Sequence, residues 1–96
     1  MDQKKIVHYL KKFKEKNKDK YHIERIGIFG SVARNDASKN SDIDIVVKLT
    51  KQDLFNIIAI KQSLEDKWHI SVDVVSYRNQ MNSFLKKRID KEAVYV

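Results

Sequence analysis

The sequence contains no cysteine and no run of apolar residues long enough to cross a membrane. The first absence excludes disulfides, thiolate nucleophiles and zinc sites built on sulfur, so no feature requires an oxidising compartment. Residues 1–20 are rich in lysine and lack the apolar segment of a signal peptide, which argues against secretion and against membrane insertion. We therefore expect a cytoplasmic protein.

The length and composition predict one compact domain spanning residues 1–96. Hydrophobic residues make up 42% of the chain, which is enough apolar material for a single core even though 34% of the residues are charged. The formal net charge of +7 suits a phosphate-bearing ligand, a nucleic acid or an acidic protein partner. Charge alone does not choose among these three.

The hydrophobic pattern predicts an α/β fold, a small mixed β-sheet flanked by helices in the order αβαβαβα. Apolar residues recur at helical spacing in the first segment, whereas residues 42–49 alternate as in a strand. Thr50 is expected to cap the third helix, with Leu54 and Ile58 on its buried side, and Phe84 is expected on the buried side of the last helix. The predicted helices are 2–17, 31–34, 51–67 and 79–91, the predicted strands are 23–29, 42–49 and 70–76, and residues 16–20 form a polar break.

Three aspartates are candidate metal ligands. Asp42 and Asp44 are two residues apart on a strand, so their side chains point to the same face. A right-handed parallel crossover through the third helix brings Asp73 beside Asp44. Such a cluster repels itself unless it holds a cation, and oxygen ligands suit Mg²⁺ or Mn²⁺, so three aspartates on neighbouring strands suggest a two-metal site. The alternative is a solvent-facing strand that carries ordinary acidic residues.

The dipeptide Gly30-Ser31 is the candidate phosphate site. It lies where the first strand turns into a helix, so glycine allows close backbone approach and the serine hydroxyl adds a donor. Only ten residues lie between Ser31 and Asp42, so the two strands are expected to be antiparallel, with glycine beside aspartate. Arg34, one turn later, either contacts a phosphate or pairs with an acidic residue and fixes the loop; the second role is favoured slightly.

The motifs GSVAR at 30–34, SDIDIVV at 41–47 and VDVV at 72–75 together resemble the DNA polymerase β-like nucleotidyltransferase superfamily, in its minimal, single-domain branch. Its members transfer a nucleoside monophosphate from a nucleoside triphosphate to a hydroxyl with two divalent metals. The resemblance implies a polymerase β palm-like fold. It also implies the site: Asp42 and Asp44 bind metal, Asp73 completes the cluster and helps to deprotonate the acceptor, and Gly30 and Ser31 hold the triphosphate. Arg34 stays a further candidate ligand because of its place one turn after Ser31.

One position departs from the family pattern. Asn35 stands where the family usually has glycine after the arginine. Asparagine is the next best residue for a left-handed turn, so we expect the turn to survive.

The resemblance also implies a partner. Minimal members commonly pair with a small helical protein of the HEPN class in toxin–antitoxin systems, and some adenylylate that partner. The resemblance thus implies that this chain is the antitoxin of such a pair and transfers AMP from ATP to a hydroxyl of its partner. The two proteins are then expected to form a hetero-oligomer. The alternative is a non-catalytic, nucleotide-binding antitoxin that neutralises its partner by contact alone. Direct nucleic-acid binding, which rests only on charge, is not expected. The lysines of the first helix form either a solvated face or a docking face for an acidic partner or RNA.

Overall fold

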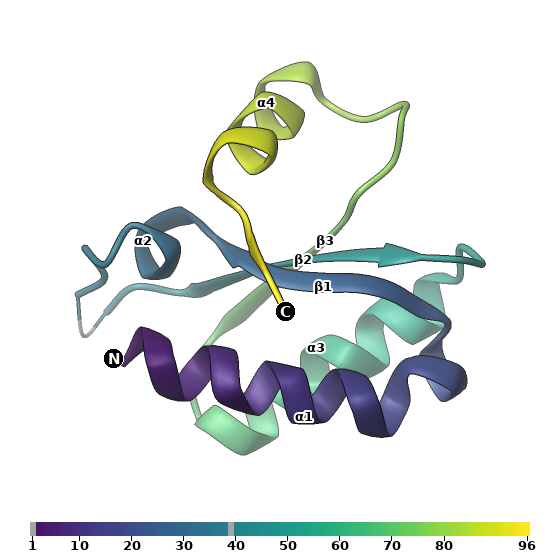
Figure 1. The fold of residues 1–96 in the computed structure, drawn as a ribbon, viewed down its shortest axis with the longest axis horizontal. Coiled ribbons are helices and arrows are strands. Elements are labelled where there is room, and N and C mark those ends of the chain that lie inside the picture. Colours follow the sequence, from purple (N-terminus) through teal and green to yellow (C-terminus); the bar gives the residue numbers. More distant parts are fainter. Residues whose placement is uncertain (1, 39) are drawn as a thin grey trace.

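A computed structural model describes residues 2–38 and 40–96, which form one four-stranded sheet with helices on both faces (Figure 1). The strand order is β3-β2-β1-β4; β2 and β3 are parallel, and the other neighbours are antiparallel. The predicted small mixed α/β fold is therefore confirmed. The elements are α1 (Gln3–Tyr21), β1 (Ile23–Phe29), α2 (Gly30–Ala33), β2 (Ile43–Leu49), α3 (Leu54–Trp68), β3 (Val72–Ser76), α4 (Ser83–Glu92) and β4 (Val94–Tyr95).

The hydrophobic core lies between the sheet and helices α1 and α3, which cover one face together (Figure 1). Ile43, Ile45 and Val47 point into it from β2 because alternate residues of a strand share a face. Val46 points to the other face, where it packs in a smaller cluster with Ile89 of α4. Asp44 belongs to this second face, because it is two residues from Val46. The candidate site is thus on the α4 side of the sheet.

Helix α1 is longer than predicted, and the expected polar break at residues 16–20 is wrong. Asp2 caps the helix, accepting a hydrogen bond from the Lys4 N–H at 2.9 Å. The segment that was expected to be a break contains neither glycine nor proline, and lysine is a good helix former. The helix ends only at His22, which adopts a left-handed conformation with φ 58°.

Two expectations about the later helices are also wrong. Asp53 caps α3 in place of Thr50, accepting from the Phe55 N–H at 2.9 Å. The Thr50 N–H donates instead to the backbone carbonyl of His22, which holds Thr50 at the end of the sheet. Leu54 is 71% exposed and Phe84 is 83% exposed. Ile58, which was also expected on the buried side of α3, is 49% exposed; Ile60 and Leu64 form the buried stripe of this helix.

The short strand β4 was not predicted. Gly27 of β1 faces Tyr95 in the antiparallel register. A Cβ on Gly27 would meet the backbone of Val94 and Tyr95 at less than 3.0 Å, so glycine is required for the end of the chain to pair here. In the part of the chain that the structure describes, no helix is both long and apolar enough to span a membrane.

Candidate active site

The strand registers gather the predicted site residues at one end of the sheet. Phe29 pairs with Asp44 across the antiparallel β1–β2 ladder, so the chain turns at Gly30 beside that aspartate. Asp44 pairs with Asp73 across the parallel β2–β3 ladder, as the crossover through α3 predicted. Asp42 directly precedes β2 at the same end. The turn and the three acidic residues therefore share one edge, at the left of Figure 1 beside α2.

Gly30 is buried and has φ +73°, a conformation that favours glycine. A Cβ at this position would collide with the carboxylate of Asp44. Two independent constraints therefore require glycine: the backbone conformation and the close approach of the acid. The turn then continues into the short helix α2, in which Ser31 is half-buried.

The turn after α2 survives the replacement of glycine by asparagine, as expected. Asn35 has φ 60° and donates its backbone N–H to the carbonyl of Val32 at 3.1 Å. The Asp36 N–H then donates to the carbonyl of Ser31 at 2.9 Å. Asparagine tolerates the left-handed conformation better than other residues with a Cβ, so the chain can reverse toward β2.

The environment of Asp44 disfavours its ionised form. Burial raises the pKa of the Asp44 carboxyl, and the negative charges of Asp73 and Asp42 raise it further. The cations of Arg88 and Arg34 lower the pKa but do not cancel these effects. The Arg88 guanidinium is 3.9 Å from the Asp44 carboxylate. A positive charge placed among these acids would therefore be favourable.

The chemistry of the three carboxylates fits Mg²⁺ or Mn²⁺, which prefer oxygen ligands. Asp42 and Asp73 are exposed, whereas Asp44 is half-buried. Among residues 2–38 and 40–96, no three histidine, cysteine or acidic side chains are already gathered at metal-binding distance. The three aspartates therefore lie at the same end of the sheet, but their carboxylates are not close enough together to bind one metal ion as they stand.

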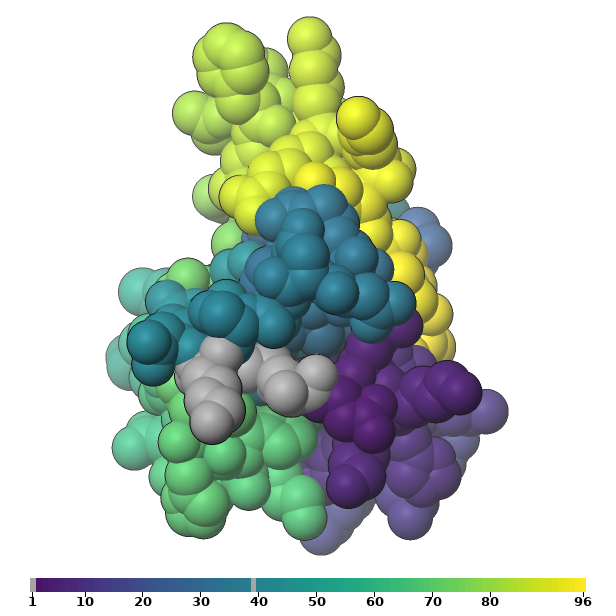
Figure 2. All heavy atoms as spheres, turned by 90° about the vertical axis from the view of Figure 1, so that its left-hand side faces the viewer, coloured from purple at the N-terminus to yellow at the C-terminus, as the bar shows by residue number. Residues whose placement is uncertain are grey.

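Arg34 pairs with acidic residues in this structure, which is the arrangement that the slightly favoured alternative describes. It forms two hydrogen bonds to the carboxylate of Glu92, at 3.1 and 2.9 Å, and one to Asp36 at 3.1 Å. These hydrogen bonds raise the pKa of the Arg34 guanidinium. Figure 2, which faces this end of the molecule, shows the α2 segment in blue directly below α4 in yellow.

The roles of Glu92 and Arg88 were not predicted from the sequence. Glu92 also accepts the N–H of Gly30 at 3.2 Å and the Arg88 Nε–H at 3.3 Å. Burial raises the pKa of the Glu92 carboxyl, but the hydrogen bond and charge of Arg34, with smaller contributions from Gly30 and Arg88, outweigh burial, so the net pKa is lowered. The only sequence signal is that Arg88 and Glu92 are four residues apart on a helix.

Comparisons with known proteins agree with this architecture. Residues 4–96 match the family of polymerase beta nucleotidyltransferases. A candidate protein adenylyltransferase from Methanocaldococcus jannaschii is 35% identical over 92 residues, covering 95% of this chain and 94% of that protein. The protein adenylyltransferase MntA from Thermococcus cleftensis is 31% identical over 84 residues, covering 86% and 84%.

Several solved structures have a fold similar to that of this chain. A candidate minimal nucleotidyltransferase superposes with a TM-score of 0.78 at 27% identity, over 98% of this chain and 95% of the other. A toxin–antitoxin complex with AMP-PNP gives a TM-score of 0.72 at 22% identity, over 99% and 72%. A tri-AMPylated HEPN toxin from Shewanella oneidensis in complex with its MNT antitoxin gives 0.59 at 21% identity, over 88% and 69%.

Removing the charge of Asp44 should stabilise the metal-free protein. A carboxyl whose pKa is raised on folding contributes stability below its ordinary pKa of 3.8 and loses that contribution as the pH rises through the raised value. The free energy of unfolding of Asp44→Asn near pH 8 should therefore exceed that of wild type by an amount on the order of 1 kcal/mol, and the variant should melt at a higher temperature. The difference should shrink as the pH falls toward about 4. Thermal melts in chelator measure this.

The control for that experiment is Asp66→Asn, which removes an exposed carboxylate from α3. It should change the melting temperature little at any pH, because an exposed charge is well solvated. Equal melting temperatures for Asp44→Asn and wild type near pH 8 would show that ionised Asp44 does not destabilise the metal-free protein.

The Arg34–Glu92 pair should stabilise the turn more than an ordinary surface ion pair. Both carboxylate oxygens of Glu92 accept from the Arg34 Nη1, and the Glu92 side chain is only 17% exposed. A double-mutant cycle with Arg34→Ala and Glu92→Ala should give a coupling free energy of about 1 kcal/mol or more. The control is the Lys48–Glu24 pair, whose side chains are 47% and 45% exposed; its coupling should be about 0.5 kcal/mol or less. Equal couplings would contradict the proposed role of Glu92.

Proposed function

Because this chain belongs to the polymerase beta nucleotidyltransferase family, we propose that it transfers AMP from ATP to a hydroxyl of a protein partner, as the antitoxin of a HEPN-class toxin. Membership confirms the family and the enzyme class that the motifs predicted. The observation that carries the proposal is the pairing of Asp44 with Asp73 directly beside the Gly30 turn. Carboxylates and phosphate donors on one edge are what nucleotidyl transfer requires.

The names of similar proteins support the finer parts of the proposal. MntA from Thermococcus cleftensis is a protein adenylyltransferase. The structure from Shewanella oneidensis pairs an MNT antitoxin with an AMPylated HEPN toxin, and another toxin–antitoxin complex holds AMP-PNP. By this analogy, we infer that ATP is the donor and that a helical HEPN-type protein is the partner, in a hetero-oligomer. We also propose that the reaction takes place in the cytoplasm, where ATP is available.

We assign Asp42, Asp44 and Asp73 to hold Mg²⁺ or Mn²⁺. When bound, the cations neutralise the triphosphate and stabilise negative charge that develops on its oxygens. The raised pKa of Asp44 supports this assignment, because a carboxylate that is costly to ionise in the metal-free protein gains most from a cation.

The chain's own groups bind the triphosphate and move the proton. We assign the Ser31 hydroxyl and the Gly30 N–H to the phosphates; the Gly30 N–H is donated to Glu92 in this structure, so a phosphate would replace that carboxylate. The acceptor oxygen attacks the α-phosphorus, the bond from that phosphorus to the β-phosphate oxygen breaks, and pyrophosphate leaves. Asp73, which is exposed, takes the proton of the acceptor hydroxyl.

Binding of ATP should require a divalent cation. Three acids on one edge repel a triphosphate until a cation lies between them. Titration calorimetry should therefore detect ATP binding with Mg²⁺ or Mn²⁺ and none in chelator. Mg²⁺ should also raise the melting temperature of the wild type but not that of Asp44→Asn. Equal ATP affinity in chelator would contradict the assignment of the metal ligands.

Transfer of labelled AMP to a co-expressed HEPN-class partner should depend on the acids far more than on the serine. Asp42→Ala and Asp44→Ala should reduce labelling to background, because metal binding is lost. Ser31→Ala should reduce it by about tenfold, since one donor of several is removed. Asp66→Asn is the control and should label at the wild-type rate.

The same variants distinguish the alternative function. If Asp44→Ala abolishes labelling yet still neutralises the partner fully, contact alone explains neutralisation. If Asp42→Ala and Asp44→Ala label the partner as fast as wild type, the assigned site is wrong.

A further inference from the structure

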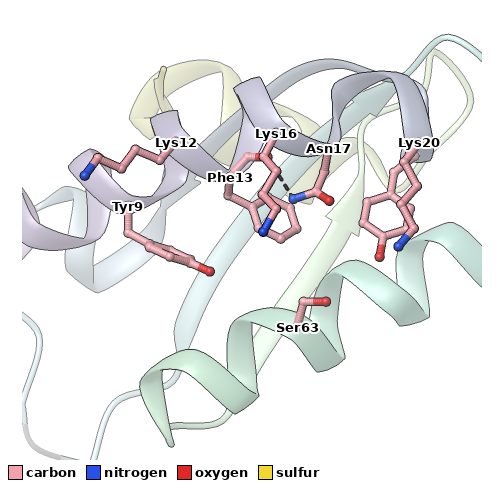
Figure 3. Close-up of a pocket in the computed structure, with 8 residues that line it drawn as sticks. Tyr9, Lys12, Phe13, Lys16, Asn17, Lys20 and Ser63 are labelled. Carbon is pink, nitrogen blue, oxygen red and sulfur yellow. Dashed lines mark hydrogen bonds between the residues drawn. The ribbon is translucent and has the colours of Figure 1, made fainter.

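A groove between α1 and α3 lies on the opposite face of the sheet from the candidate active site (Figures 1 and 3). Its volume is about 360 Å³. In Figure 3 the amines of Lys16 and Lys20 and the hydroxyls of Tyr9 and Ser63 point into the space between the two helices. The full lining is Tyr9, Lys12, Phe13, Lys16, Asn17, Lys20, Tyr21 and Ser63.

The charge of this groove is not neutralised within the part of the chain that the structure describes. None of the residues lining it is acidic, and its three lysines take part in no ion pair there. Lys67 adds a fourth cation nearby, 5.1 Å from the centre of the Tyr9 ring. Tyr9, Asn17 and Ser63 offer polar groups among the cations. The groove is therefore suited to an anionic ligand that also forms hydrogen bonds.

The spacing of the lysines indicates the shape of that ligand. Lys12, Lys16 and Lys20 are four residues apart, so they form one stripe along α1 with steps of about 6 Å. In an extended peptide, side chains that point the same way recur about every 6.6 Å. An extended segment with an acidic residue at every second position can place one carboxylate opposite each lysine.

The aromatic residues of the groove argue against single-stranded RNA. Stacking of bases needs an open ring face. Phe13 is 5% exposed and Tyr21 is 9% exposed. Tyr9 is half-buried; its ring centroid is 5.7 Å from that of Trp68 in a T-shaped arrangement, and the Lys67 amine lies over the ring. No ring is left open as a platform for a base.

We propose that this groove binds an extended acidic segment of a partner protein. The proposal does not rest on the proposed function, because the lining residues come from α1 and α3, whereas the carboxylates lie on the α4 side of the sheet. The α1 helix then has two distinct polar surfaces: the docking stripe of Lys12, Lys16 and Lys20, and a solvated surface elsewhere.

A labelled peptide of alternating glutamate and serine, with its glutamine analogue as the uncharged control, tests the proposal by fluorescence anisotropy. Lys16→Gln/Lys20→Gln removes two cations of the groove. Lys11→Gln/Lys18→Gln is the matched control, because it removes the same charge from the opposite side of the same helix, where both residues are exposed. Each double variant is also tested for ATP binding with Mg²⁺.

We expect the acidic peptide to bind wild type and the Lys11→Gln/Lys18→Gln control alike, and Lys16→Gln/Lys20→Gln about fivefold more weakly. Binding should vanish near 1 M salt, where the screening length is about 3 Å. ATP binding should be the same in all three proteins, so a failure here does not touch the proposed function. The proposal is overturned by equal weakening in both double variants, by absence of peptide binding, or by tighter, groove-dependent binding of a single-stranded RNA of equal charge.

Discussion

The backbone of Gly30 lies against the carboxylate of Asp44, and the architecture around the candidate site depends on this contact. It exists because Phe29 and Asp44 are opposite each other in the β1–β2 ladder, so the chain must turn at the next residue. The contact leaves no room for a side chain at Gly30 and holds the Asp44 carboxylate half-buried. The same contact thus positions the turn and raises the pKa of the acid.

Helix α4 stabilises the Gly30 turn and the position of Asp44 through side chains near the C-terminal end of the sequence. Glu92 satisfies the Gly30 N–H and holds Arg34, while Arg88 bridges Glu92 and Asp44. The carboxylate of Glu92 therefore lies where an anion is favoured in this structure. The family motif at residues 30–34 is therefore held in place by α4, which is far from it in sequence. The pairing of β4 with β1 brings α4 to this position.

The sheet separates two regions of opposite charge. The acids of β2 and β3 lie on the α4 side, whereas the lysine stripe of α1 lies on the side of the main core. The intervening layer of β-branched residues is buried, which keeps the two regions from pairing directly. A cation at the acids and an acidic segment at the lysines would therefore be bound independently.

The sequence by itself determined the mixed α/β fold, the strands of the core and the meeting of Asp44 with Asp73, because strand periodicity and crossover length are local quantities. It also determined the left-handed turn at Asn35. Only the tertiary structure decided the features that depend on contacts distant in sequence. Examples are the ion pair of Arg34 with Glu92, the pairing of β4 beside Gly27, and the choice of which face of α3 packs on the sheet, which leaves Leu54 exposed. No periodicity encodes these features, since each depends on how two distant segments pack.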